Sequence, residues 1–222
     1  MSLTPHSYSV PVTHHLYLTV YLPVYLTEMP VGQAVPGAFL CFAAALLLVF
    51  ASVSSPTWER ISFLDVRSGT TTIHFGVFGY TGSKASIGYH FDPPNIDFNT
   101  SHLESTIILN LTKALILHPI AAGLSGIAFL FGLCGISRHR SGTVFMTLVS
   151  GLAAITTFVV WVIDMSLFGV ARKQFRDQGF SAQYGNANWL TLGALAALLL
   201  GFISSTVGIF GSYKRRDYKS SY

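Results

Sequence analysis

Residues 36–54 read PGAFLCFAAALLLVFASVS, an apolar run without a single charged side chain. A helix needs about 20 mainly apolar residues to cross the hydrocarbon core of a membrane. Pro36 suits the first turn of such a helix, and Ser55-Pro56 favours its end, because a residue before proline disfavours helical geometry. The run therefore predicts a transmembrane helix over residues 36–54.

Three further segments meet the same requirement, at about residues 114–136, 143–168 and 189–211. Only 10% of the chain is charged, whereas a soluble domain carries about 25% charged residues. This deficit excludes a water-soluble surface, and no basic stripe with interleaved aromatic residues indicates a nucleic-acid partner. We therefore expect a mainly α membrane fold, a four-transmembrane-helix bundle over residues 33–213.

Residues 1–32 do not add a span. The first 30 residues contain four prolines and no lysine or arginine, and the apolar stretch at 16–26 is too short to cross a membrane. The basic beginning of a signal peptide is missing. We expect a flexible N-terminal segment and a working protein that begins at Met29.

Basic residues near span ends prefer the cytoplasm and set the expected orientation. Arg138 and Arg140 crowd the short loop between the second and third spans, and residues 214–222 form a short basic tail after the fourth. The opposite side is not free of basic residues, since it holds Lys113, Arg172, Lys173 and Arg176. Density favours cytoplasmic N- and C-termini and an extracellular loop over residues 57–113.

Two kinds of membrane-surface chemistry follow from this orientation. The loop over residues 57–113 contains two N-glycosylation sequons, at Asn99 and Asn110. Lys214, Arg215 and Arg216 are expected to contact anionic lipid headgroups, at roughly 1 kcal/mol per basic residue. The simpler interpretation of these basic residues is a topology anchor, and the two roles are compatible.

The first loop is large enough for a small sheet. Residues 70–78 and 85–91 alternate apolar and polar side chains around a glycine-bearing turn, which predicts a β-hairpin. Residues 61–66 and 106–111 are expected to add strands, because two strands alone are marginal in water. The prediction is a small antiparallel sheet on the extracellular ends of the helices.

Two polar residues in the spans are candidates for chemistry. Asp164 is the only acidic residue inside a predicted span, and a carboxylate there is costly and is a functional candidate by default. His118 begins the second span, which runs in the opposite direction, so the two side chains can meet at the same depth. The pair is either proton-sensitive or a structural interhelical hydrogen bond, or else Asp164 simply reaches water.

The other histidines and the cysteines indicate no site. His74, His90 and His102 lie in the first loop at a spacing that matches no metal pattern, and a solvated or sheet-packed role is preferred. Cys41 and Cys134 lie inside spans, so neither can close a disulfide in the loop. No nucleophile with a histidine base and no phosphate-binding loop is present. We therefore expect no enzyme, no cofactor and no metal.

Small residues recur at four-residue spacing in two spans. They are Ala122, Gly126, Ala128 and Gly132 in the second, and Gly193, Ala197, Gly201 and Ser205 in the fourth. This spacing lets helix backbones approach closely in lipid. Packing within the bundle is favoured over a homo-oligomer face.

The order of four short motifs resembles the fungal PalI-type pH-response regulators, which are grouped with the cortical-patch proteins of the plasma membrane. The motifs are Ser-Ser-Pro-Thr-Trp at 54–58, FGVFGY at 75–80, ALILHP at 114–119 and WVID at 161–164. The resemblance covers about residues 30–213. The architecture is also similar to that of claudins, where the first loop carries a disulfide that this chain lacks, so claudin-like adhesion is not expected.

The resemblance implies a non-enzymatic plasma-membrane accessory protein that assists a seven-span ambient-pH sensor at neutral to alkaline pH. The alternative that it implies is a structural organiser of cortical membrane domains, which affects cell-wall integrity or endocytosis. A small channel or transporter ranks last, because the spans are smooth and apolar apart from His118 and Asp164. The expected partners are membrane lipid and another membrane protein, with no nucleic acid.

Overall fold

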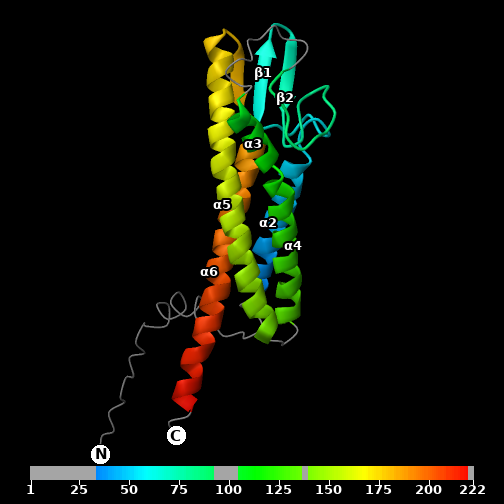
Figure 1. The fold of residues 1–222 in the computed structure, drawn as a ribbon. Coiled ribbons are helices and arrows are strands. Elements are labelled where there is room, and N and C mark those ends of the chain that lie inside the picture. Colours follow the sequence, from blue (N-terminus) through cyan, green and yellow to red (C-terminus); the bar gives the residue numbers. More distant parts are fainter. Residues whose placement is uncertain (1–33, 93–104, 137–139, 220–222) are drawn as a thin grey trace, which may run out of the picture.

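Four long helices form the body of the molecule (Figure 1). The computed structural model describes residues 34–92, 105–136 and 140–219. The helices are α2 (Ala34–Ser52), α4 (Leu117–Ile136), α5 (Arg140–Asp177) and α6 (Ala187–Lys219). Each is long and apolar enough to cross a membrane, which confirms the predicted four-span fold. The expected N-terminal segment, with Met29, lies outside the described residues.

Small residues form the contacts between these helices. α2 packs against both α4 and α6, and α5 packs against α4 and α6. A Cβ atom added to Gly132 of α4 would clash with Ala38 of α2, at 2.8 Å from its Cβ. A Cβ added to Gly201 of α6 would lie 3.4 Å from the backbone oxygen of Gly37. These glycines therefore serve packing within the bundle.

A three-stranded antiparallel sheet lies at one end of the bundle, with strand order β2-β1-β3 (Figure 1). The strands are β1 (Leu64–Ser68), β2 (Thr71–Phe75) and β3 (Ser181–Tyr184). The sheet, helix α3 (Thr106–Ala114) and the loops around them are called the cap below. β3 comes from the connection between α5 and α6, so the sheet joins two connections that are far apart in the sequence.

The hairpin predicted over residues 70–78 and 85–91 is wrong in its second strand. Residues 71–75 do form a strand, but their partner is β1 rather than residues 85–91. Gly88 has a φ of 79°, a left-handed conformation that interrupts any extended run there. Tyr89 is instead buried, and its backbone N–H donates to the hydroxyl of Thr112 at 3.2 Å. The strand expected over 61–66 begins later, at Leu64.

The strand predicted over residues 106–111 is a helix, α3. Ser105 caps it, because its hydroxyl accepts a hydrogen bond from the N–H of Ile108 at 3.4 Å. Ile108 and Thr112 are the buried residues of the helix and lie four positions apart, on one helical face. The short apolar run fits both periodicities, and the serine cap decides in favour of the helix.

The third membrane helix continues beyond its predicted end at residue 168 and reaches Asp177. Phe168, Ala171 and Phe175 are all fully buried, at helical spacing, in the core of the cap. The phenyl ring of Phe75 on β2 lies 5.7 Å from that of Phe175 and 5.1 Å from that of Phe91. This aromatic core holds the cap together in the absence of a loop disulfide.

The motif at residues 54–58 packs against the motif at residues 75–80. The N–H of Val77 donates to the hydroxyl of Ser54 at 3.0 Å, and Gly76 faces the backbone of Ser55. The buried hydroxyl of Tyr89 donates to the carbonyl of Gly76 at 2.9 Å. Burial raises the pKa of Tyr89, so its phenol keeps the proton that this bond needs.

Replacing Gly76 with alanine is expected to lower the free energy of unfolding by about 1–3 kcal/mol, because the new methyl group would overlap backbone atoms of Ser55. The measurement is a denaturant titration of the purified full chain in detergent. Gly123→Ala is the matched control, since a Cβ there meets no atom within 4 Å. Equal stability of the two variants would contradict the close packing at Gly76.

Candidate functional site

The two polar residues expected inside the spans are in contact. His118 lies in the first turn of α4, and Asp164 lies on the neighbouring helix α5. The Nε2 atom of His118 is 3.1 Å from the Oδ2 atom of Asp164, and both side chains have no exposed surface. This His118–Asp164 pair is the candidate functional site.

The remaining contacts of the imidazole identify its hydrogen atoms. The Nδ1 atom lies 3.0 Å from the carbonyl oxygen of Leu115, and a carbonyl only accepts, so Nδ1 carries a hydrogen. Nε2 then either donates to an ionised Asp164 or accepts from a protonated one. The pair therefore shares one proton between an imidazole and a carboxylate that water does not reach.

Thr191 of α6 adds a third helix to the site. Its hydroxyl donates to the carbonyl of Ala187 at 3.1 Å and lies 3.5 Å from Nε2 of His118. Because the hydroxyl has one hydrogen, it can only accept from His118. Thr191 therefore brings α6 into contact with the imidazole, so that three helices meet at the pair.

One oxygen of the site has no partner. The Oδ1 atom of Asp164 is buried and makes no hydrogen bond within the described part of the chain. An orphaned buried acceptor costs about 1–3 kcal/mol, and more when it carries charge. The pair therefore leaves one polar atom unsatisfied between the spans, and buried polar groups without a partner are uncommon in folded proteins.

The cap rests directly on this pair. The ring of Phe63, which precedes β1, lies edge-on to the imidazole of His118 at 5.0 Å and stacks on Phe168 at 5.2 Å. The backbone oxygen of Phe63 accepts from the amide of Asn188 at 2.8 Å. Because Phe63 directly precedes β1, a shift of β1 would also change the contact between Phe63 and His118.

Exposed tryptophans mark the depth of the site. Trp189, at the beginning of α6, is 70% exposed, and Trp58, after α2, is 43% exposed. Amphipathic aromatic rings favour the headgroup region of a bilayer. Thr191 is only two residues from Trp189, so the pair lies at the cap-side edge of the membrane rather than at its centre.

Sequence reasoning missed Phe63 and Thr191. Phe63 was expected only as part of a strand over residues 61–66, and it lies in the loop before β1, so no sequence pattern indicated its contact with His118. Thr191 had a weak signal, because polar Asn186 and Asn188 also stand at the beginning of an otherwise apolar helix. A polar first turn in a span is a sign that its side chains have partners.

The other candidate residues lie apart from the pair. Asn110 is exposed on α3, but Thr112 of the same sequon is buried and donates to the carbonyl of Tyr89 at 3.1 Å, a structural role of its own. α6 runs through Lys214, Arg215 and Arg216. Asn99 and His102 lie outside the described residues.

Cys41 is buried in α2, and Cys134 is exposed on α4. Within residues 34–92, 105–136 and 140–219, no three His, Cys, Asp or Glu side chains are grouped so that they could hold a metal ion.

A family model described as the SUR7/PalI family matches residues 34–204. The chain belongs to this family. All four motifs and the His118–Asp164 pair lie within the matched region. SUR7/PalI proteins are membrane proteins and regulators and are not a known class of enzyme.

Two curated proteins are similar to this SUR7/PalI chain. The pH-response regulator protein palI/prr-5 of Neurospora crassa is 30% identical over 149 residues, which is 61% of this chain and 21% of that protein. The serine/threonine transporter SstT of Bifidobacterium adolescentis is 29% identical over 205 residues, which is 81% of this chain and 46% of the transporter. The chain therefore matches about a fifth of the length of the pH-response regulator and about half of the length of the transporter.

Proposed function

We propose that this SUR7/PalI protein is a non-enzymatic accessory protein of ambient-pH signalling in the plasma membrane. The observation that carries the proposal is the family match, together with the similarity to a pH-response regulator. The buried His118–Asp164 pair supports it, because a shared proton beneath the cap gives the bundle a group that protonation can change. The expected partner is a seven-span membrane protein that senses pH.

The orientation proposed has the cap outside and both termini in the cytoplasm. α5 has 38 residues and is about 57 Å long, whereas the hydrocarbon core is about 30 Å thick. Its basic residues Arg172 and Lys173 lie near the end of this helix, beside the cap, where Arg172 donates to the carbonyl of Ala182 at 3.3 Å. Basic residues in such a folded region count less toward the expected orientation than those of a short loop. Arg138, Arg140 and the basic end of α6 then mark the cytoplasmic side.

The resemblance to the cortical-patch proteins implies a second candidate function, an organiser of cortical membrane domains. The accessory protein must bind a pH sensor, whereas an organiser must form patches when that sensor is absent. The similarity to a transporter favours neither. Transporter sites are built where helices break at mid-membrane, but the break between α3 and α4, at residues 115–116, lies at the cap end.

Deleting the gene in its host is expected to abolish proteolytic activation of the pH-response transcription factor at alkaline pH, and the intact gene is expected to restore it. The measurement is the ratio of processed to full-length factor in cells moved from acidic to alkaline medium. A His118→Gln variant is expected to restore less processing than the intact gene.

Normal processing in the deletion strain would contradict the signalling role and favour the cortical organiser. Resistance to cell-wall stress is then the assay to follow. A His118→Gln variant with unchanged stability and unchanged pH response would leave the pair with a structural role only.

A further inference from the structure

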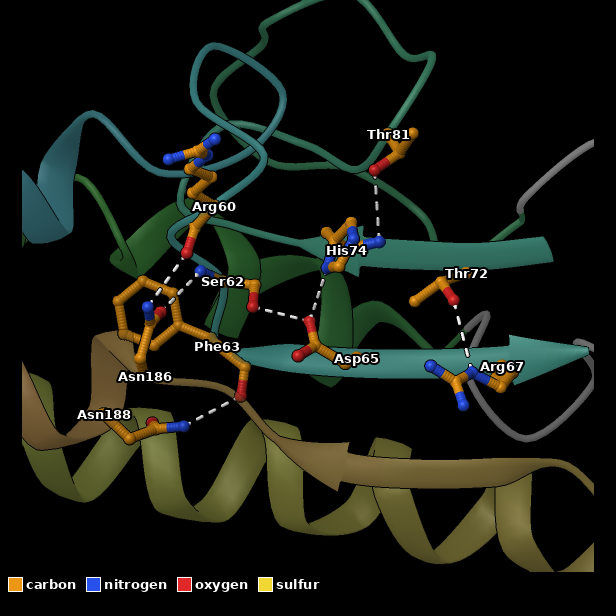
Figure 2. A network of polar contacts seen from close by, with 10 residues as sticks. All are labelled: Arg60, Ser62, Phe63, Asp65, Arg67, Thr72, His74, Thr81, Asn186 and Asn188. Carbon is orange, nitrogen blue, oxygen red and sulfur yellow. Dashed lines mark hydrogen bonds and ion pairs between the residues drawn. The ribbon is translucent and has the colours of Figure 1, made fainter. Parts of the chain in front are cut away.

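The sheet face that points away from the helices carries a second histidine–carboxylate pair (Figure 2). His74 of β2 lies directly opposite Asp65 of β1 in the antiparallel register. The Nδ1 atom of His74 is 2.7 Å from the Oδ1 atom of Asp65, and the side chains are 27% and 36% exposed. Water and protons reach this pair, in contrast to the buried pair below it.

Ser62 connects the exposed pair to the beginning of α6. Its hydroxyl donates to the same Oδ1 atom of Asp65 at 2.5 Å. Its backbone N–H donates to the side-chain oxygen of Asn186 at 3.1 Å, and its carbonyl accepts from the N–H of Ala187 at 2.9 Å. Asn186 also donates to the carbonyl of Arg60 at 2.9 Å, which fixes the loop before β1 (Figure 2).

Phe63, the next residue, connects the same segment to the buried pair. Its ring touches His118, and its carbonyl accepts from Asn188 of α6. Two consecutive residues, Ser62 and Phe63, therefore separate a water-accessible proton site from the proton shared within the membrane.

We propose that the His74–Asp65 pair is the proton-responsive element of the cap, and that Ser62 and Phe63 transmit its state to the His118–Asp164 pair. The proposal rests on the proposed function in pH response and assigns the group through which this accessory chain itself responds to pH. The physical basis is a hydrogen bond between two strands that gains or loses a charge.

The direction of the response follows from the donor. Histidine is the side chain whose charge changes between pH 5 and pH 8. Protonated His74 donates a charge-assisted bond to Asp65, and such bonds are roughly twice as strong as neutral ones. At acidic pH the stronger bond therefore stabilises the pairing of β2 with β1. At alkaline pH the weaker bond allows the two strands and residues 62–63 to open more often.

Several charged or titratable side chains lie near His74, and Asp65 is the one that we expect to determine how the pair responds to pH. Glu59, Arg60 and Tyr184 line the same open depression of about 440 Å³ as the pair. Glu59 and Arg60 are adjacent and opposite in charge. Arg67, two residues further along β1, donates to the hydroxyl of Thr72 at 3.4 Å. The carboxylate of Asp65 is the acidic group bonded to His74 in the described part of the chain.

Hydrogen exchange of the purified full chain in lipid nanodiscs at pH 5.5 and pH 8 tests the proposal, with rates corrected for intrinsic exchange. Protection of residues 64–75 and 187–191 is expected to fall roughly two- to five-fold at the higher pH, the range for partly exposed ion pairs. His74→Gln keeps a hydrogen-bond donor but no titration, so it should abolish this difference in both segments. His90→Gln, at an exposed loop histidine, should leave it unchanged.

Ser62→Ala tests the transmission. It should leave the pH difference at residues 64–75 in place and remove it at residues 187–191. A His74→Gln protein with the wild-type difference would overturn the detector, and a Ser62→Ala protein with an intact response in α6 would overturn the path. Because these measurements use purified protein, they are independent of whether the host needs the chain for signalling, which the deletion strain decides separately.

Discussion

Replacing His118 with leucine is expected to lower the free energy of unfolding by about 3–5 kcal/mol, since it leaves the buried carboxylate of Asp164 without a partner. The lost hydrogen bond is the smaller contribution, because bonds between membrane helices are worth only about 0.6–2 kcal/mol. Unfolding in mixed micelles with increasing denaturing detergent measures the change. The double variant His118→Leu/Asp164→Leu should recover most of the loss, since neither polar group then remains.

Comparison of the single and the double variant separates the effect of the stranded carboxylate from that of packing. His118 also touches Phe63, so part of the loss could come from a worse fit against that ring. If the double variant is no more stable than His118→Leu, packing rather than the stranded carboxylate is responsible. Asp164→Asn provides a further comparison, because its amide can still bond Nε2 and should cost less than His118→Leu.

The spans could be predicted from the sequence because the lipid requirement is local. About 20 apolar residues in a row suffice to identify a membrane helix, whatever the rest of the chain does. α2 spans Ala34–Ser52, close to the predicted 36–54. The end of α5 was missed because the helix continues past residue 168 on amphipathic spacing, packed against the cap, which a hydropathy window does not detect.

The sheet was harder to predict because strand pairing is not local. The strand in residues 71–75 was found, but its neighbours are decided by contacts elsewhere. β3 reads SAQY, which has little strand preference of its own, and it pairs with β1 because the end of α5 brings it there. α3 was misread as a strand because its short apolar run suits either structure.

The candidate site could be predicted in part. A carboxylate and an imidazole on antiparallel helices, each about one turn from the same boundary, can be placed at one depth by counting 1.5 Å per residue. That argument cannot say which faces of the two helices meet, and it gives no role to Thr191 or Phe63. Those contacts depend on where the cap sits, and the cap depends on non-local pairing.

Phe63→Ala is expected to lower the free energy of unfolding by about 3–5 kcal/mol and to expose His118. The side chain is fully buried between the imidazole and Phe168, and removing a buried phenyl ring leaves a cavity that the neighbours fill only in part. Phe63→Leu keeps most of the apolar volume and should cost less. Unfolding of the full chain in detergent measures the first effect, and modification of His118 by diethyl pyrocarbonate, followed by mass spectrometry, measures the second.

The stability and the modification of His118 together decide whether the side chain of Phe63 shields the buried pair from water. In the wild-type protein His118 has no exposed surface, so it should resist the reagent while exposed His90 reacts. In Phe63→Ala the two histidines should react at more similar rates, and in Phe63→Leu His118 should stay protected. A Phe63→Ala protein that is destabilised but still protects His118 would make Phe63 a core residue of the cap alone. The segment over 62–63 would then have no means of passing the state of the sheet to the membrane.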